Sequence, residues 1–292
     1  MKESFSNAFN NTKKTLAGFT AEGITAIPRV EIINRKVLQE AREWLKHGSI
    51  VVYFGPHTCV FDPAITTQRI LMPHLINKSD STRFAWFTSS KFTGTDTEKP
   101  TMGLASTAAA AYANRMGFEM LPLVQTYRQS VTEQEAAAIN MKSLREALNI
   151  LKTPGGIVAL SPEGTRGTTG GLLRGNEGLR VLLKSRSALA LPIVLNGVHQ
   201  MQARDKSGLN GLHPFVKISA CIGKLISHSQ AEDMARKYSW VDISLGEFTV
   251  ADALMVHLAA TDLTPWQDNV DPRGVYAWDN IQSKVAAADR LS

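Results

Sequence analysis

Hydrophobic and polar positions along the chain alternate between short apolar runs and longer stretches with helical spacing. Residues 31–46 place apolar side chains on one helical face and charges on the other, which predicts an amphipathic helix. Residues 49–54, SIVVYF, are β-branched and aromatic and predict a buried strand. Asp62 and Pro63 then have the character of a helix cap and a first-turn proline, opening a helix to about residue 76. The pattern predicts a strand, loop and helix unit.

The same alternation continues to the end of the chain. The sequence predicts further strands at 84–89, 118–124, 157–160, 190–195 and 215–222, and further helices at 102–115, 132–152, 176–187, 230–238 and 249–262. Thr132 and Glu135 form a capping-box pair, and Pro122 indicates an edge strand. Strands separated by helices predict an α/β fold, a mostly parallel mixed sheet with helices on both faces and an N-terminal amphipathic helix.

A chain of 292 residues is long enough for one large α/β domain with helical additions. We expect an N-terminal helical segment at 1–48, an α/β core at 49–228, and a C-terminal helical region at 229–292 that packs on the core. The helix at 31–46 would pack on this core or lie on a membrane surface, and packing is the more common outcome.

Composition narrows the class of protein. With 43% hydrophobic and 20% charged residues, the chain is neither a disordered nor a fibrous protein. Cys59 and Cys221 form no C-x-x-C pair, so neither a disulfide framework nor a zinc cluster is indicated. The longest apolar run, about 188–195, is far shorter than the roughly 18 residues that a membrane-spanning helix needs. We expect a cytoplasmic protein without a secretion signal, soluble or peripheral to a membrane.

The formal net charge is +6, and the basic excess lies in the first 228 residues, whereas the remainder is acidic. A basic body attracts anionic lipid, an acidic carrier protein or nucleic acid, because all three carry clustered negative charge. The alternative is that the charge only keeps the protein soluble.

The first candidate site is the segment from His57 to Asp62, a histidine and a carboxylate five positions apart in a strand-to-helix turn. A carboxylate that accepts from one imidazole nitrogen leaves the other nitrogen free as a general base. His57 would then take a proton from an attacking hydroxyl. The alternative is that Asp62 only caps a helix and His57 is a loop histidine.

The second candidate site is Ser161-Pro162-Glu163-Gly164-Thr165-Arg166, directly after a predicted buried strand. Glycine lets a ligand approach the backbone, and the arginine fork suits a phosphate. These residues indicate an anion site. The alternative is a tight turn with a Glu163–Arg166 pair.

Together the two motifs resemble the glycerolipid acyltransferase family typified by 1-acylglycerol-3-phosphate acyltransferase. The H-x-x-x-x-D box of that family matches His57 and Asp62, and its E-G-T-R box matches 163–166 in the same order and at a similar separation, within a likeness covering most of 50–200. Weaker likenesses are Leu191-Pro192-Ile193-Val194-Leu195, Lys91-Phe92, and two strings near the C-terminus, at 250–255 and 272–276.

The resemblance implies an acyltransferase of phospholipid synthesis that works at the inner face of a membrane. His57 would be the base and Asp62 its orienting partner, while Arg166, Gly164 and Thr165 bind the acceptor phosphate and Glu163 orders their loop. The donor would be a thioester of CoA or acyl carrier protein, with no metal or other cofactor. The partners implied are that donor, a phospholipid precursor and an anionic membrane surface, and no nucleic acid.

The chain departs from the family at two blocks. Residues 117–122 lack the arginine of an Ile-Asp-Arg block, for which Arg128 is the candidate replacement, and 175–178 replace a basic F-K-x-G stretch, for which Arg174 is the candidate. With Lys91, these two complete the candidate substrate-binding residues. An acceptor other than lysophosphatidate, or a non-catalytic membrane or acyl-carrier binding protein, is the alternative.

Motifs of other mechanisms are absent from the sequence. It contains no G-x-S-x-G nucleophile elbow, no G-x-x-x-x-G-K phosphate loop and no H-E-x-x-H metal helix. The oxyanion of the acyl-transfer reaction needs hydrogen-bond donors, and we expect backbone N–H groups near the start of the helix after Asp62 to supply them.

Overall fold

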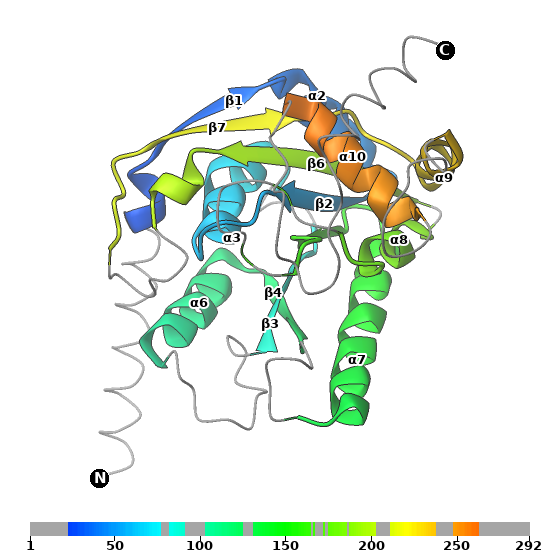
Figure 1. The fold of residues 1–292 in the computed structure, drawn as a ribbon, viewed down its shortest axis with the longest axis horizontal. Helices are drawn as coiled ribbons and strands as arrows, with labels where there is room; N and C mark the ends of the chain where they lie inside the picture. Colours follow the sequence, from blue (N-terminus) through cyan, green and yellow to red (C-terminus); the bar gives the residue numbers. More distant parts are fainter. Residues whose placement is uncertain are drawn as a thin grey trace.

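The computed structural model describes residues 23–76, 82–90, 103–124, 131–164, 166, 172, 175–185, 187–202, 211–237 and 248–262. Within this part of the chain, seven strands form one sheet in the order β1-β7-β6-β2-β5-β3-β4 (Figure 1). The strands are β1 (Arg29–Ile33), β2 (Ser49–Gly55), β3 (Phe84–Ser89), β4 (Glu119–Leu123), β5 (Ile157–Leu160), β6 (Ala188–Asn196) and β7 (Lys217–Ile222).

All neighbouring strands are parallel except β6 and β7, which are antiparallel. Strands β1 and β7 therefore run opposite to the other five, and they begin at the edge of the sheet where β2 and β6 end (Figure 1). The predicted α/β class, a mostly parallel mixed sheet, is confirmed.

Helices cover both faces of the sheet. One layer contains α2 (Arg35–Leu45), α3 (Asp62–Ile65) and the π-helix η1 (Thr66–Leu71), whose apolar side chains join one core cluster, and α4 (Met72–His74) continues η1. The other layer contains α7 (Glu133–Leu151), α8 (Gly178–Leu183), α9 (His228–Lys237) and α10 (Val250–Asp262), which share a second cluster. Further helices are α6 (Gly103–Met116) and the short η3 (Val198–Gln200), and residues 23–26 are also helical.

Strand β2 lies in the middle of the sheet, between β5 and β6, and all seven of its residues are buried. Ile50, Val52 and Phe54 face one core cluster, while Val51 and Tyr53 face the other. Apolar side chains on both faces explain the unbroken run in the sequence, because a central parallel strand has no solvent-facing side. The carboxyl end of β2 leads directly to His57.

The helix predicted at 31–46 is present, but the prediction of its first residues is wrong. Residues 29–33 form β1, an edge strand paired in parallel with β7, and α2 begins at Arg35. Asn34 joins the two in a left-handed conformation, at a φ of 60°. The side chains of β1 alternate between exposed and half-buried, a period of two that the helical pattern of the following residues hid.

The helix predicted after Asp62 is present, but its form differs from the prediction. It passes from α3 into the π-helix η1 and returns to α-helix at Met72. Asp62 is the first residue of α3 and does not cap it, because its carboxylate turns back to the preceding loop. The interpretation of Asp62 as a simple helix cap is therefore wrong.

The other elements agree with the sequence within a few residues. Pro122 lies in β4 at the edge of the sheet, and the capping box of Thr132 and Glu135 opens α7. Helix α8 is shorter than predicted, ending at Leu183. None of the helices that the structure describes is both long enough and apolar enough to cross a bilayer.

Candidate active site

The turn after β2 brings an imidazole and a carboxylate together. The Nδ1 atom of His57 lies 2.9 Å from Oδ2 of Asp62, which is completely buried. The same Oδ2 accepts the backbone N–H groups of Thr58 and Cys59, at 2.7 and 2.9 Å. Two amides and the imidazole thus hold one carboxylate in place. With Nδ1–H directed to Asp62, Nε2 is the basic nitrogen, and 20% of the His57 side chain remains exposed to meet a substrate.

The second motif reaches the first through Glu163. Its buried carboxylate accepts the backbone N–H of His57, with Oε1 2.9 Å from the nitrogen. The contact is possible because β5, which precedes Glu163, is the direct neighbour of β2, with Leu160 opposite Tyr53. The prediction that the two motifs belong to one site is therefore supported by a direct hydrogen bond. Glu163 holds the backbone of His57, a contact that spacing in the sequence does not reveal.

Three further hydrogen bonds hold the turn around Glu163. Gly164 takes a φ of 64°, a conformation that favours glycine, and its N–H donates to the Ser161 carbonyl at 3.2 Å. Asn176 donates both its backbone N–H and its side-chain amide to the Pro162 carbonyl, each at 2.8 Å. Sequence reasoning treated Asn176 only as part of a departure from the family pattern. The structure instead gives it a positioning role.

Arg166 lies near the same turn, and its charge acts on Cys59. Burial raises the pKa of the Cys59 thiol to about 12, with a further upward contribution from Asp62. The N–H groups of Phe61 and Val60 and the charge of Arg166 act in the opposite direction. Cys59 is therefore a protonated, buried thiol and not a nucleophile.

The expected oxyanion donors are mostly engaged elsewhere. The amides of Thr58 and Cys59 donate to Asp62, and those of Asp62 and Ile65 donate to carbonyl groups. Pro63 has no N–H. These groups are therefore not free to serve as oxyanion donors.

Helix α10 packs closely against two chain segments near the candidate site, those that contain Gly55 and Gly175. A Cβ atom added to Gly55, two residues before His57, would lie 3.0 Å from Cδ2 of Leu258. A Cβ atom on Gly175 would lie 2.7 Å from Cγ of Met255. Two glycines therefore let one helix approach the two chain segments that carry the site. This close packing is a contribution of the C-terminal region that its sequence did not indicate.

Aromatic side chains form a wall beside His57. The rings of Phe54 and His57 have centroids 6.0 Å apart, and Phe54 meets Trp86 edge-on at 5.1 Å. The indole N–H of Trp86 donates to Thr67 Oγ1 at 2.6 Å, which ties this wall to η1. The His57 imidazole therefore has an apolar side.

Several predicted site residues cannot be placed. Lys91, Arg128, Thr165 and Arg174 lie outside the described residues, so their substrate-binding roles stay predictions. Among the residues that the structure does describe, no three His, Cys, Asp or Glu side chains gather as metal ligands.

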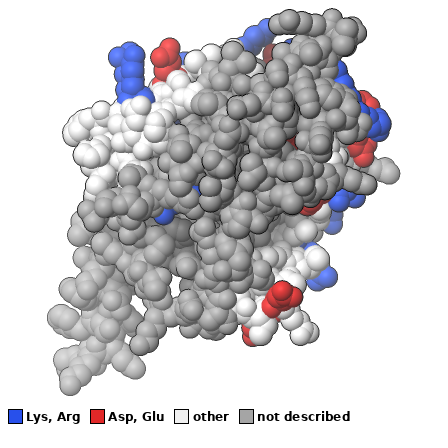
Figure 2. Space-filling view, viewed as in Figure 1, with Lys and Arg blue, Asp and Glu red and all other residues white. Residues whose placement is uncertain are grey.

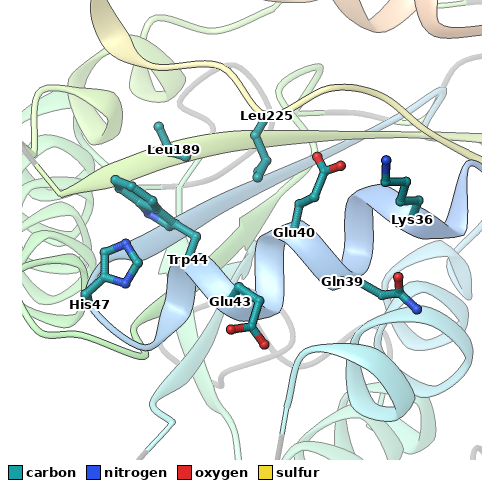
Figure 3. Close-up of a pocket in the computed structure, with 8 residues that line it drawn as sticks. All are labelled: Lys36, Gln39, Glu40, Glu43, Trp44, His47, Leu189 and Leu225. Carbon is teal, nitrogen blue, oxygen red and sulfur yellow. The ribbon is translucent and has the colours of Figure 1, made fainter.

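A separate groove of about 470 Å³ runs along α2 (Figure 3). Trp44, Leu189 and Leu225 form its apolar part, and charged side chains of α2 surround it. It includes His47, which lies just before the start of β2, whereas His57 follows the end of that strand. The groove is therefore not part of the His57 site.

No protein-family model matches the chain, and no curated protein sequence matches it. Among solved structures, it is similar to the 1-acyl-sn-glycerophosphate (LPA) acyltransferase PlsC from Thermotoga maritima. That alignment has a TM-score of 0.47 and 14% sequence identity, and it covers 90% of this chain and 91% of the other. A likeness at this level carries no functional argument, so the function has to be inferred from the residues of the site.

Proposed function

We propose that the chain is an O-acyltransferase that moves a fatty acyl group from a thioester of CoA or acyl carrier protein to the hydroxyl of a phosphate-bearing glycerolipid, such as lysophosphatidate. The observation that carries the proposal is the His57–Asp62 pair, 2.9 Å apart, with Asp62 buried and His57 partly exposed. An oriented, accessible imidazole is what removal of a proton from an alcohol requires.

The reaction follows from this geometry. Nε2 of His57 takes the hydroxyl proton of the acceptor as its oxygen attacks the thioester carbonyl carbon. The tetrahedral intermediate collapses, the carbon–sulfur bond breaks, and the imidazolium returns the proton to the leaving thiolate. The products are an ester and a free thiol. Asp62, held by two backbone N–H groups, lies beside the imidazolium and stabilises it.

The loop that follows β5 is the proposed acceptor site. Arg166 follows Glu163 by three residues, and Glu163 accepts the backbone N–H of His57, so the guanidinium group of Arg166 is proposed to bind the acceptor phosphate beside the base. Gly164 and Thr165 would offer backbone groups to the same phosphate. Lys91, Arg128 and Arg174 are proposed as further cations for the donor or the acceptor.

The test is acyl transfer by the purified full-length chain, followed by mass spectrometry of the lipid products. Labelled acyl-CoA and labelled acyl carrier protein serve as separate donors. His57→Ala should lower the rate at least about 100-fold, since a positioned general base contributes that much or more. His47→Ala is the matched control, because this exposed histidine lies at the other end of β2. Equal activity in the two variants would exclude His57 as the base.

The choice of acceptors separates the alternatives. Lysophosphatidate, a lysolipid without a phosphate and an ornithine lipid are compared in parallel. Arg166→Gln should raise KM for the phosphate-bearing acceptor and leave kcat nearly unchanged, because a uniform phosphate contact acts on ground and transition states alike. Transfer only to a phosphate-free lipid would point to a different acceptor. Vesicle binding without transfer to any acceptor would indicate a non-catalytic binding protein.

A further inference from the structure

Large apolar side chains are exposed at few places on the described part of the chain. These are Ile27, Ile33, Met141 and Phe215, with exposed fractions of 42%, 39%, 49% and 89%. An isolated exposed apolar side chain on a soluble protein needs no explanation. Phe215 is different because a whole aromatic ring is in water, and because it has an apolar neighbour in the fold.

The apolar neighbour in the fold is Ile27, because both residues lie just before adjacent strands. Arg29 of β1 pairs with Lys217 of β7, and the parallel register continues from there. Ile27 and Phe215 each precede this first pair by two residues, Ile27 in a bend that leads into β1. All four residues are exposed. Two apolar and two cationic side chains thus share one corner of the sheet.

This corner lies at the same end of the strands as the candidate active site. Strand β7 is antiparallel to β6, with Ser219 opposite Asn196, so β7 begins where β6 ends. Strand β6 is parallel to β2, with Val194 opposite Gly55, so β2 ends at that same edge. Figure 1 shows this arrangement. With strands about 4.8 Å apart, the start of β7 is displaced by roughly 10 Å, and that of β1 by roughly 15 Å, from the end of β2.

The charge around the corner favours an anionic partner. Arg29 and Lys217 flank the two apolar residues, and Glu31 is the acidic member of β1. Figure 2 shows mostly uncharged surface on the side of the molecule where β1 and β7 begin in Figure 1. Lys or Arg atoms and a smaller group of Asp or Glu atoms lie along it. An aromatic ring beside cations is the chemistry of a membrane interface, where the ring enters the lipid boundary and the cations meet anionic headgroups.

We propose that Ile27, Arg29, Phe215 and Lys217 form a docking patch for an anionic lipid bilayer. Phe215 enters the interface, Ile27 lies against it, and the two cations bind lipid phosphates. This proposal rests on the proposed function for its purpose, since a lipid acceptor would then reach His57 from the membrane beside it. Binding to the bilayer is nonetheless a property of the surface alone, and it can be measured without acyl transfer.

The test measures binding of the full-length chain to vesicles of phosphatidylcholine with and without phosphatidylglycerol, by sedimentation. Removal of one cation, in Arg29→Gln or Lys217→Gln, should weaken binding to the anionic vesicles about fivefold. Phe215→Ser should weaken it by on the order of tenfold, because an apolar ring no longer leaves water. Met141→Ser and Ile33→Ser are matched controls: Met141 is an exposed residue on α7, and Ile33 lies at the opposite end of β1.

A second measurement places Phe215 directly. Both native cysteines are buried, so a fluorescent label on a Phe215→Cys variant reports on that position alone, with Met141→Cys for comparison. The label at 215 should shift to the blue on anionic vesicles, while the label at 141 should not.

Equal losses in the patch and control variants would overturn the proposal, as would no preference for anionic vesicles. A change from dimer to monomer in Phe215→Ser would also overturn it, since the patch would then bind a second copy of the chain. The two proposals fail separately. If the wild-type chain acylates a detergent-dispersed acceptor but does not bind vesicles, the docking patch is refuted and the proposed function stands. If it binds vesicles through the patch but transfers no acyl group, the proposed function is refuted and the docking patch stands.

Discussion

The hydrogen bond from the His57 backbone to Glu163 makes a quantitative prediction. The two atoms are 2.9 Å apart, Glu163 is completely buried, and the acceptor is a carboxylate. Hydrogen bonds to charged groups contribute about 1.5–3 kcal/mol. Glu163→Ala should therefore lower the free energy of unfolding by about 2 kcal/mol. If the same energy is lost from the positioning of His57, kcat falls about 30-fold.

Glu163→Gln separates the charge from the hydrogen bond. The amide oxygen can still accept the His57 N–H, and neutral hydrogen bonds are about half as strong as charge-assisted ones. The expected loss is then about 1 kcal/mol in stability and about fivefold in kcat. The order of activity should be wild type, then Gln, then Ala. Urea unfolding gives the stabilities, and steady-state acyl transfer gives kcat and KM separately.

Glu177→Ala is the control for these variants. Glu177 lies in the segment that leads into α8, and its exposed carboxylate pairs with Arg180. Because exposed ion pairs contribute little, stability should change by less than about 1 kcal/mol and kcat should not change. The reasoning is refuted if Glu163→Ala keeps kcat and raises only KM for the acceptor. Glu163 would then contact the substrate instead of holding the base.

Three further predictions follow from the same structure. Gly55→Ala should reduce kcat at least about tenfold, because the new Cβ would lie 2.9 Å from Glu163 Oε1; Gly178→Ala, where no atom is within 4 Å, should leave kcat unchanged. Cys59→Ala should keep its activity, and wild-type Cys59 should resist iodoacetamide at neutral pH because its thiol has a pKa of about 12. Burial lowers the pKa of His257 below 6.5, so its contribution to stability is present above pH 6.5 and is lost as pH falls through the folded pKa. Urea unfolding at a series of pH values below 6.5 should show that the free energy of unfolding falls more steeply with decreasing pH for wild type than for His257→Gln.

Periodicity predicted most of the fold because the central strands are apolar throughout. Residues 49–54 and 157–160 form β2 and β5 as predicted, since both faces of each strand are buried and the apolar runs are short. The edge strand β1 was missed because its five residues have partly exposed side chains and run directly into an amphipathic helix. The π-helix η1 carries no residue pattern that distinguishes it from an α-helix.

The site was predictable where its residues are close in sequence. His57 and Asp62 share a turn, so their spacing was sufficient to suggest contact. The bond from His57 to Glu163 spans 106 positions and depends on β2 and β5 being neighbours, which no local pattern encodes. Asn176 was hidden for the same reason, because its partner, Pro162, lies in a loop that only the folded sheet brings close.

The packing of α10 behind the two loops has a consequence for how the protein comes to be active in the cell. Leu258 lies against Gly55, so the segment carrying His57 reaches its final surroundings only after about two hundred more residues have been synthesised. A ribosome-bound chain that has not released α10 would carry the complete His57–Asp62 turn without its support. If the proposed function holds, acyl transfer should begin only once translation has passed the end of this helix, and a nascent chain should not consume thioester before then.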